Sequence, residues 1–124
     1  MLQLRDNNSN IVFPNKWGFF GGGVKMGERP DVSVKREMSE ELDLKKFKTL
    51  KYINKYFDSK TNSLFYIYTL KLLEKVKLKE GVDYEFFFEN TYFKKKKSRK
   101  FGKVFYCADK RLMKIFVNMS KRYF

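Results

Sequence analysis

Residues 22–44, GGVKMGERPDVSVKREMSEELDL, decide the fold. The stretch opens on glycines, which break regular structure and allow the backbone to approach another group closely. Pro30 then suits the first position of a helix, and Asp31 suits the positive end of the helix dipole. We therefore predict a glycine loop followed by a helix over residues 30–42.

The predicted helix has two distinct faces. At about 100° per residue, three carboxylates fall within one arc of the helix: Glu37, Glu40 and Glu41. An apolar stripe with the spacing i, i+4, i+8 runs beside them: Val34, Met38 and Leu42. One face of the helix is thus expected to pack on a sheet, while the next presents three carboxylates together.

Three carboxylates on one helical face repel one another, and a divalent cation removes that penalty. Mg²⁺ binds about six oxygens, which it usually shares with phosphates and water. The glycine loop can add a backbone carbonyl, and Arg36 can hold a neighbouring carboxylate or contact a phosphate. The chain has no histidine and one cysteine, which excludes histidine triads and the common zinc sites. An all-oxygen site indicates Mg²⁺, Mn²⁺ or Ca²⁺.

The same residues resemble the Nudix box. Its spacing is Gly, five residues, Glu, seven residues, Arg-Glu, an apolar residue, any residue, Glu-Glu, any residue, Gly and an apolar residue. The matching positions are Gly22, Glu28, Arg36, Glu37, Met38, Glu40, Glu41 and Leu44. Asp43 stands where the family has glycine. Because aspartate tolerates the left-handed turn that ends many helices, we expect a small stability cost and no loss of chemistry.

The resemblance extends upstream, where segments 2–6 and 16–22 look like the approach to the box in many bacterial-type members. Phe20 stands where many members have proline. The resemblance implies an α/β fold, namely the Nudix-type α/β/α sandwich with a mixed sheet. Relative to that family fold, we expect the first strand to be missing before residue 2. The sheet would then lose an edge strand or gain one from a partner, and the second case makes a homodimer one expectation. The alternative is that the true start of the protein lies upstream.

The resemblance also implies which residues bind metal and act in catalysis. The implied metal ligands are the Gly22 carbonyl, Glu37, Glu40, Glu41 and an outlying Glu80, for which Glu85 and Glu89 are alternatives. The metal would be Mg²⁺, with Mn²⁺ as the alternative. The implied catalytic residues are Glu37, Arg36 and Glu28. Glu37 is the general base in some members, while a later loop supplies the base in others.

The implied substrate-binding residues are Trp17, Phe20 and Arg5. From the residues alone, core packing is favoured for Trp17 and Phe20, and a wall of the pocket for the base is the functional alternative. Hairpin packing is favoured over substrate contact for a group of tyrosines, Tyr52, Tyr56, Tyr66 and Tyr68.

The remaining elements fit one domain spanning residues 1–124. Leu2–Leu4 is expected to form a short strand, as is segment 84–88. Segments 47–57 and 62–73 indicate a hairpin with its turn at 58–62, which argues against a fully parallel sheet. The apolar spacing over residues 109–122 predicts a second helix.

The net charge of +14 is unevenly distributed. Segment 91–124 holds 12 lysines or arginines and one acid, so we regard it as a basic C-terminal segment. A solvated lysine-rich loop is favoured for residues 94–100, and attraction to RNA or another polyanion is the alternative.

The sequence contains no apolar run long enough to cross a membrane, and residues 1–6 lack the apolar core of a signal peptide. We therefore expect a cytoplasmic protein without a membrane partner. Cys107 is expected to be a buried thiol.

Together these patterns predict a Mg²⁺-dependent pyrophosphohydrolase acting on a nucleoside diphosphate linked to another group. The alternative is a catalytically silent Nudix-like module that binds nucleotide or RNA, and a third hypothesis is an enzyme acting on RNA ends. The substrate stays open among nucleoside triphosphates, nucleotide sugars, dinucleoside polyphosphates and ADP-ribose.

Overall fold

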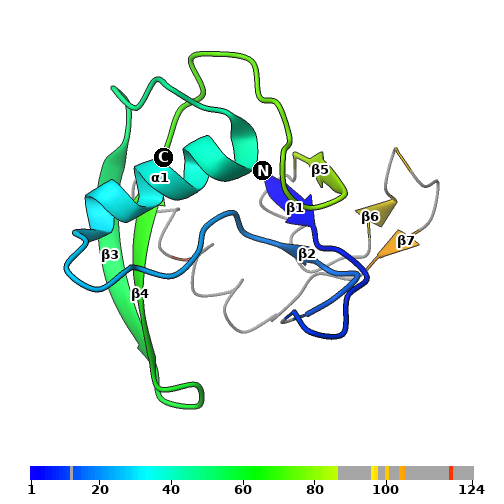
Figure 1. Cartoon of the computed structure of the whole chain (residues 1–124), viewed down its shortest axis with the longest axis horizontal. Coiled ribbons are helices and arrows are strands. Elements are labelled where there is room, and N and C mark those ends of the chain that lie inside the picture. The colour runs from blue at the N-terminus through cyan, green and yellow to red at the C-terminus, as the bar shows by residue number, and fades with distance from the viewer. Residues whose placement is uncertain (12, 87–95, 98–99, 101–103, 106–117, 119–124) are drawn as a thin grey trace.

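The structure is a computed structural model that describes residues 1–124 except 12, 87–95, 98–99, 101–103, 106–117 and 119–124 (Figure 1). Its elements are β1 (Leu2–Leu4), β2 (Trp17–Gly18), α1 (Pro30–Leu42), β3 (Lys51–Asp58), β4 (Ser63–Thr69), β5 (Asp83–Glu85), β6 (Lys96–Lys97) and β7 (Val104–Phe105). Helix α1 passes across the long hairpin of β3 and β4, and its C-terminal end lies beside β1 (Figure 1).

The N-terminal sheet has the strand order β2-β1-β5, and both of its pairings are antiparallel. Because side chains alternate along a strand, Leu2 and Leu4 lie on one face of β1 and Gln3 lies on the other. Leu2, Leu4 and Trp17 are 0% exposed and form a small core cluster. The opposite face, which carries Gln3, is therefore the one that meets α1.

The bounds of α1 are those predicted, Pro30–Leu42. Met38 and Leu42 are buried with Leu44 in a second core cluster, and Val34 packs against it, so the predicted apolar stripe is confirmed. The helix ends because Asp43 adopts a left-handed conformation with φ of 56°. Aspartate thus makes the turn for which the family pattern has glycine, as expected from its tolerance of this region.

The predicted hairpin is present, but its strands are shorter than the sequence indicated. β3 and β4 pair antiparallel, with an irregular register between Tyr52 and Asn54. Phe47 and Leu72, near the outer ends of the predicted strands, pack against the core cluster beside α1. Packing on the helix thus replaces strand pairing at these positions.

Part of the hairpin's apolar surface faces solvent. Phe57 and Leu64 form a cross-strand pair near the turn, where their exposed fractions are 55% and 46%. Tyr52 is 52% exposed, and its ring makes an edge-on contact with Tyr68. The tip of the hairpin therefore presents an apolar side beyond the area covered by α1.

The segment that follows β4 closes the core beneath the helix. Alternate residues pack on the cluster beside α1, namely Leu70, Leu72, Val76 and Leu78. The Lys77 amide donates to the Leu42 carbonyl at 3.1 Å, and the Lys79 amide donates to the Glu41 carbonyl at 2.8 Å. These bonds satisfy carbonyls that the helix C-terminus would otherwise leave unpaired.

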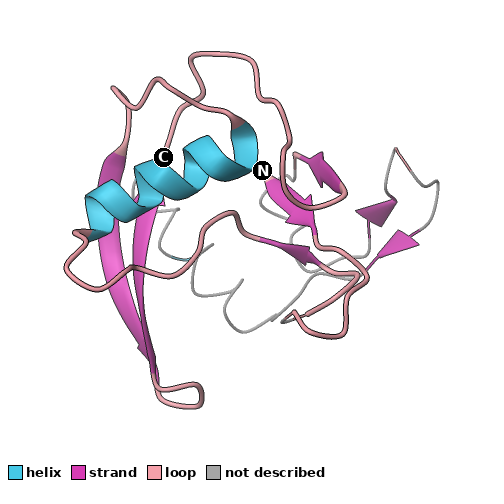
Figure 2. Ribbon diagram, in the orientation of Figure 1, coloured by secondary structure: helices cyan, strands magenta, loops and turns pink. Residues whose placement is uncertain are grey.

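An α/β fold is present, as expected, with one helix and three sheets among the described residues (Figure 2). Every pairing seen in this part of the chain is antiparallel. The mixed sheet, the α/β/α layering and the missing first strand therefore stay expectations. Residues 87–88 of one predicted strand lie outside the described residues, as does the predicted helix 109–122 apart from Asn118. No described helix has the length and apolar character needed to cross a bilayer.

Leu4→Ala tests the small core cluster of the N-terminal sheet. Loss of a fully buried leucine side chain is expected to lower the free energy of unfolding by about 2–5 kcal/mol. Leu64→Ala is the matched control, because Leu64 is 46% exposed, and its cost should stay within about 0.5 kcal/mol. Urea unfolding followed by the fluorescence of Trp17, the single tryptophan, measures both values. Equal costs for the two variants would contradict this assignment of the core.

Candidate active site

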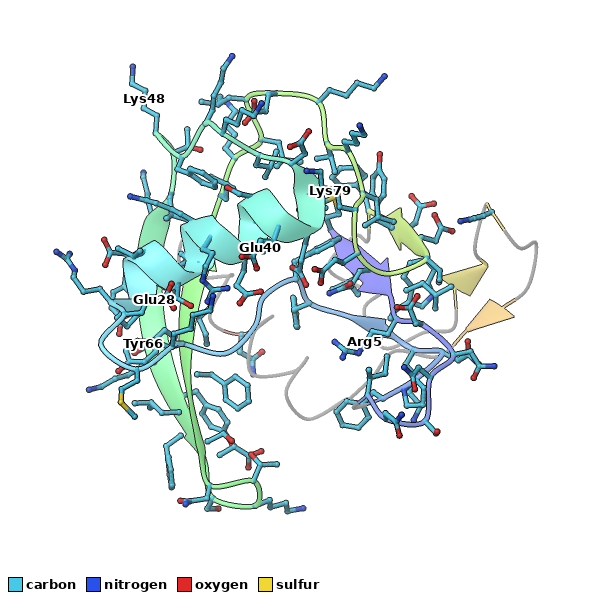
Figure 3. All side chains as sticks on the ribbon, viewed as in Figure 1. Arg5, Glu28, Glu40, Lys48, Tyr66 and Lys79 are labelled. Carbon is cyan, nitrogen blue, oxygen red and sulfur yellow. The ribbon has the colours of Figure 1, made fainter. Side chains whose placement is uncertain are left out.

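The carboxylates of α1 differ in their exposure to solvent. The side chain of Glu40 is 49% exposed and that of Glu37 is 14% exposed, while Glu41 is 5% exposed. Glu40 and Glu28 lie along the same side of the helix (Figure 3). The predicted carboxylate face therefore runs from a solvent-facing group to a buried one.

Arg36 connects this face to the glycine loop. Its Nε donates to Glu28 Oε1 at 2.8 Å, and its Nη2 donates to Glu28 Oε2 at 3.0 Å. The same guanidinium contacts Glu37 Oε1 at 2.6 Å and Glu40 Oε2 at 3.2 Å. Nη2 also donates to the Gly23 carbonyl at 3.0 Å. One cation therefore fixes three carboxylates and the loop backbone.

These contacts shift the protonation equilibria of the partners. The hydrogen bonds from Arg36 lower the pKa of Glu28 to about 2, helped by the Lys25 amide, which donates to Glu28 Oε2 at 2.9 Å. The hydrogen bonds to Glu28 and Glu37 raise the pKa of Arg36 above its usual value. The Arg36–Glu28 pair thus stays charged at any physiological pH.

Glu41 connects α1 to the N-terminal sheet. Its Oε2 accepts the Gly21 amide at 2.9 Å, and its Oε1 accepts Gln3 Nε2 at 3.2 Å. Burial raises the pKa of Glu41 to about 7, and the nearby charges of Glu37 and Glu80 add to this effect, which the two hydrogen bonds oppose. Glu41 is therefore costly to ionise unless a cation compensates its charge.

Gly22 lies directly against the carboxylate of Glu37. A Cβ at position 22 would overlap that carboxylate, whereas one at Gly23 would meet no atom within 4 Å. The backbone of the loop can therefore approach the carboxylates only because position 22 has no side chain.

The donor set of this face fits a hard cation. No three Asp, Glu, Cys or His side chains of the described residues already converge closely enough to hold an ion. Arg36 contacts Glu37 and Glu40, and Glu41 is held by Gly21 and Gln3. The chemistry nevertheless suits Mg²⁺, because all donors are oxygens and Glu41 is destabilised by burial and like charge. The tight approach of Gly22 to Glu37 supports the same fit.

The proposed outlying ligand Glu80 is brought close to Glu41. Its amide lies 3.5 Å from the Glu41 carbonyl, and its charge contributes to the raised pKa of Glu41. Glu85, by contrast, pairs with Leu2 and so lies on the sheet face opposite Gln3. Glu80 is thus favoured over Glu85, and Glu89 lies outside the described residues.

The three residues expected to bind substrate occupy different surroundings. Trp17 is 0% exposed and pairs with Leu4, which favours the core-packing interpretation. Phe20 lines a cavity. Arg5 follows Gln3 by two residues, its Cδ lies 3.5 Å from an ideal Cβ at Gly18, and its buried Nε has no hydrogen-bond partner among the described residues. Such an orphaned donor is suited to an anion.

A cavity of about 560 Å³ lies between α1 and the hairpin. Its lining is mostly apolar and includes Phe19, Phe20, Tyr66, Tyr68 and Phe86. Gly22 and Glu37 also line it, so the cavity is continuous with the carboxylate face. This size and lining are typical of a small-molecule site.

Sequence reasoning missed two of these features. For Tyr66 and Tyr68 the sequence favours hairpin packing over substrate contact, yet both line the cavity. Gln3 received no role, although its side chain is buried and donates to Glu41. The alternation Leu2-Gln3-Leu4 was the available signal, because a polar residue within a buried strand requires a partner on its own face.

The raised pKa of Glu41 predicts that stability depends on pH when no divalent cation is present. The folded-state pKa of about 7 lies above the ordinary value of 4.5, so the folded chain binds this proton more tightly than the unfolded chain. Stability should therefore fall as the pH rises from about 4.5 to about 7. At about 1.4 kcal/mol per pKa unit, the loss is on the order of 3 kcal/mol.

Urea unfolding in EDTA at several pH values measures this loss for the wild type and for Glu41→Gln. The variant should lose most of the pH dependence in this window, because the lowered pKa of Glu28 acts at more acidic pH. If the wild type became more stable between pH 4.5 and 7, Glu41 would not be the group that dominates the pH dependence of stability.

Comparisons with known proteins identify the family of the chain. The family model described as the NUDIX domain matches residues 1–108. The curated relatives include the nucleoside triphosphatase NudI of Salmonella arizonae, Salmonella newport and Salmonella dublin, each 43% identical over 42 residues. The matched part covers 34% of this chain and only 28% of each relative. No solved structure matches the chain. Because the family match spans most of the sequence, the chain belongs to the Nudix family.

Proposed function

We propose that the chain is a Mg²⁺-dependent hydrolase that cleaves the pyrophosphate linkage of a nucleoside diphosphate joined to another group. The observation that carries this proposal is the joining of two features. The carboxylate face of α1 and the apolar cavity share Gly22 and Glu37. A phosphate chain at the carboxylates would therefore place the attached nucleoside within reach of the cavity. The name of the NudI relatives, nucleoside triphosphatase, supports a nucleotide substrate.

Glu37, Glu40 and Glu41 would hold the metal, together with the Gly22 carbonyl and with Glu80 as an outlying ligand. When bound, Mg²⁺ neutralises the diphosphate and lowers the pKa of an attacking water. Arg36 keeps the carboxylates in position through its contacts to Glu37 and Glu40. Its pairing with Glu28 secures the loop that carries Gly22.

The reaction is attack of water on phosphorus. The water oxygen forms a bond to phosphorus while the bridging P–O bond breaks, and the bond electrons go to the departing phosphate oxygen. Glu37 accepts the proton of the water in the role implied by the family pattern. The products are a nucleoside monophosphate and a phosphorylated remainder or pyrophosphate.

Two further parts of the chain would bind the substrate. Phe20, Tyr66 and Tyr68 line the cavity and offer aromatic surface to a base. Arg5, with its unpartnered Nε, is the proposed contact to a substrate phosphate. Trp17 is left out of this assignment because its side chain is fully buried.

Turnover of a panel of nucleoside triphosphates, nucleotide sugars, dinucleoside polyphosphates and ADP-ribose tests the proposal, with Mg²⁺ against EDTA. We expect Mg²⁺-dependent release of nucleoside monophosphate from at least one compound. Glu40→Gln and Glu41→Gln should lower kcat/KM by about 100-fold or more, since even supporting residues of metal sites contribute about 10–100-fold.

Asp31→Asn is the control for this experiment. It removes the same charge from the same helix, but Asp31 pairs with Arg29 in the first turn, away from the carboxylate face. Its kcat/KM should stay near that of the wild type. Retained nucleotide binding without any turnover would favour the catalytically silent module instead.

Gly22→Ala tests the close approach of the loop to Glu37. The added methyl group would overlap the Glu37 carboxylate, so activity should fall by about 10–100-fold and need more Mg²⁺ for half-maximal rate. Gly23→Ala is the neighbouring control, because its methyl group meets open space. Steady-state rates across a Mg²⁺ titration separate the two variants. Similar behaviour of both would argue that the loop backbone has no part in the site.

A further inference from the structure

Seven exposed lysines lie on the two neighbouring segments that follow α1 and β4. They come from two segments, residues 43–50 and 70–80, and are Lys45, Lys46, Lys48, Lys71, Lys75, Lys77 and Lys79. The same segments contain three acids, Asp43, Glu74 and Glu80. We call these seven residues the lysine edge. Lys79 lies close to the C-terminal end of α1, and Lys48 points outward on the other side of the view, above the start of β3 (Figure 3).

Hydrogen bonds hold the two segments together. The carboxylate of Glu74 accepts the amides of Lys45 and Lys46 at 2.6 and 2.7 Å. The Thr49 hydroxyl donates to the Lys71 carbonyl at 2.6 Å. The lysine edge therefore rests on a fixed backbone, with Glu74 occupied by main-chain amides.

The packing of residues 70–79 arranges four of the lysines in a row. The inward residues, Leu70, Leu72, Val76 and Leu78, belong to the core beside α1. The residues between them that face solvent include Lys71, Lys75, Lys77 and Lys79. Residues two apart in an extended chain lie roughly 6–7 Å from each other. The chain bends at Glu74 and exposes Leu73 before it, so this spacing applies to Lys75, Lys77 and Lys79, and Lys71 lies on the other side of the bend.

The charges of this row are mostly uncompensated. Lys79 pairs with Asp43 at 3.2 Å, and within the described residues no ion pair involves Lys71, Lys75 or Lys77. The row ends at the C-terminal end of α1, where the Lys79 amide donates to the main-chain carbonyl of Glu41. Separate cations spread along one segment suit a flexible chain of separate phosphates better than they suit a single anion.

We propose that the lysine edge binds the phosphate backbone of single-stranded nucleic acid. Because the row leads to Glu41, a strand bound along it would have one end at the hydrolytic site. This last step rests on the proposed function. This surface is distinct from segment 94–100, the only polyanion site that charge counting along the sequence had indicated.

Binding of a fluorescently labelled, unstructured oligouridine with a 5′-hydroxyl end tests this proposal in EDTA. The probe has no phosphoanhydride and no metal is present, so the result is independent of hydrolysis. If the protein bound the probe but turned over no nucleotide, the proposed function would be wrong and the proposed role of the lysine edge would still hold.

The triple variant Lys71→Gln, Lys75→Gln, Lys77→Gln should weaken binding by about tenfold or more at about 50 mM salt. The slope of log K against log salt should fall in magnitude by roughly 2, because each phosphate contact contributes about 0.7 for single strands. These substitutions keep the backbone amides, including that of Lys77, which bonds to Leu42. Circular dichroism verifies that the variant is folded.

The matched control is Lys25→Gln, Lys55→Gln, Lys60→Gln. It removes the same charge from exposed lysines of the glycine loop and the hairpin. The control should bind the probe nearly as well as the wild type. Equal weakening of both triple variants would overturn the proposal, since net charge alone would then explain binding. Failure of the wild type to bind the probe, or row-dependent binding to anionic lipid vesicles in place of the probe, would overturn it as well.

Discussion

Arg36 holds the carboxylate face of α1 in place, since its guanidinium contacts Glu28, Glu37 and Glu40 at distances of 2.6–3.2 Å. Like charges on one helical face would otherwise push these side chains apart. The same group reaches the Gly23 carbonyl, so the glycine loop is fixed relative to the helix. Most of the candidate site depends on this one cation, because it sets the positions of both the side chains and the backbone around them.

Glu41 has the complementary role of joining the helix to the N-terminal sheet. Its two oxygens accept from Gly21 and Gln3, which belong to the loop and to β1. A buried, ionisable group is an expensive connector, as its pKa of about 7 indicates. An amide or an apolar side chain would join the helix and the sheet at a lower free-energy cost. The presence of a carboxylate at position 41 is therefore consistent with a site where charge is needed.

The features that could be predicted from the sequence are those determined by interactions between residues close together in the chain. Pro30 and the left-handed turn at Asp43 set the helix bounds, and the i, i+4, i+8 stripe gave its buried face. Contacts between residues that are distant in the sequence were harder to predict. Phe47 and Leu72 were predicted to be strand residues but pack beside the helix. Trp17 lies in the core, the position that the sequence favoured over a pocket wall. The cavity joins α1 to β4, which are distant in sequence, so only the fold could reveal it.

The apolar tip of the hairpin has a consequence for how copies of this protein behave together in solution. Phe57 and Leu64 expose about half of their surfaces on a two-stranded ribbon, which is the kind of surface that promotes self-association. The net charge of +14 opposes contact between copies through mutual repulsion. That repulsion has a range of about 10 Å at 0.1 M salt and becomes shorter as salt is added. Colloidal stability is therefore set by the balance between apolar attraction at the hairpin tip and repulsion between the net charges. Ionic strength shifts this balance because it screens the repulsion.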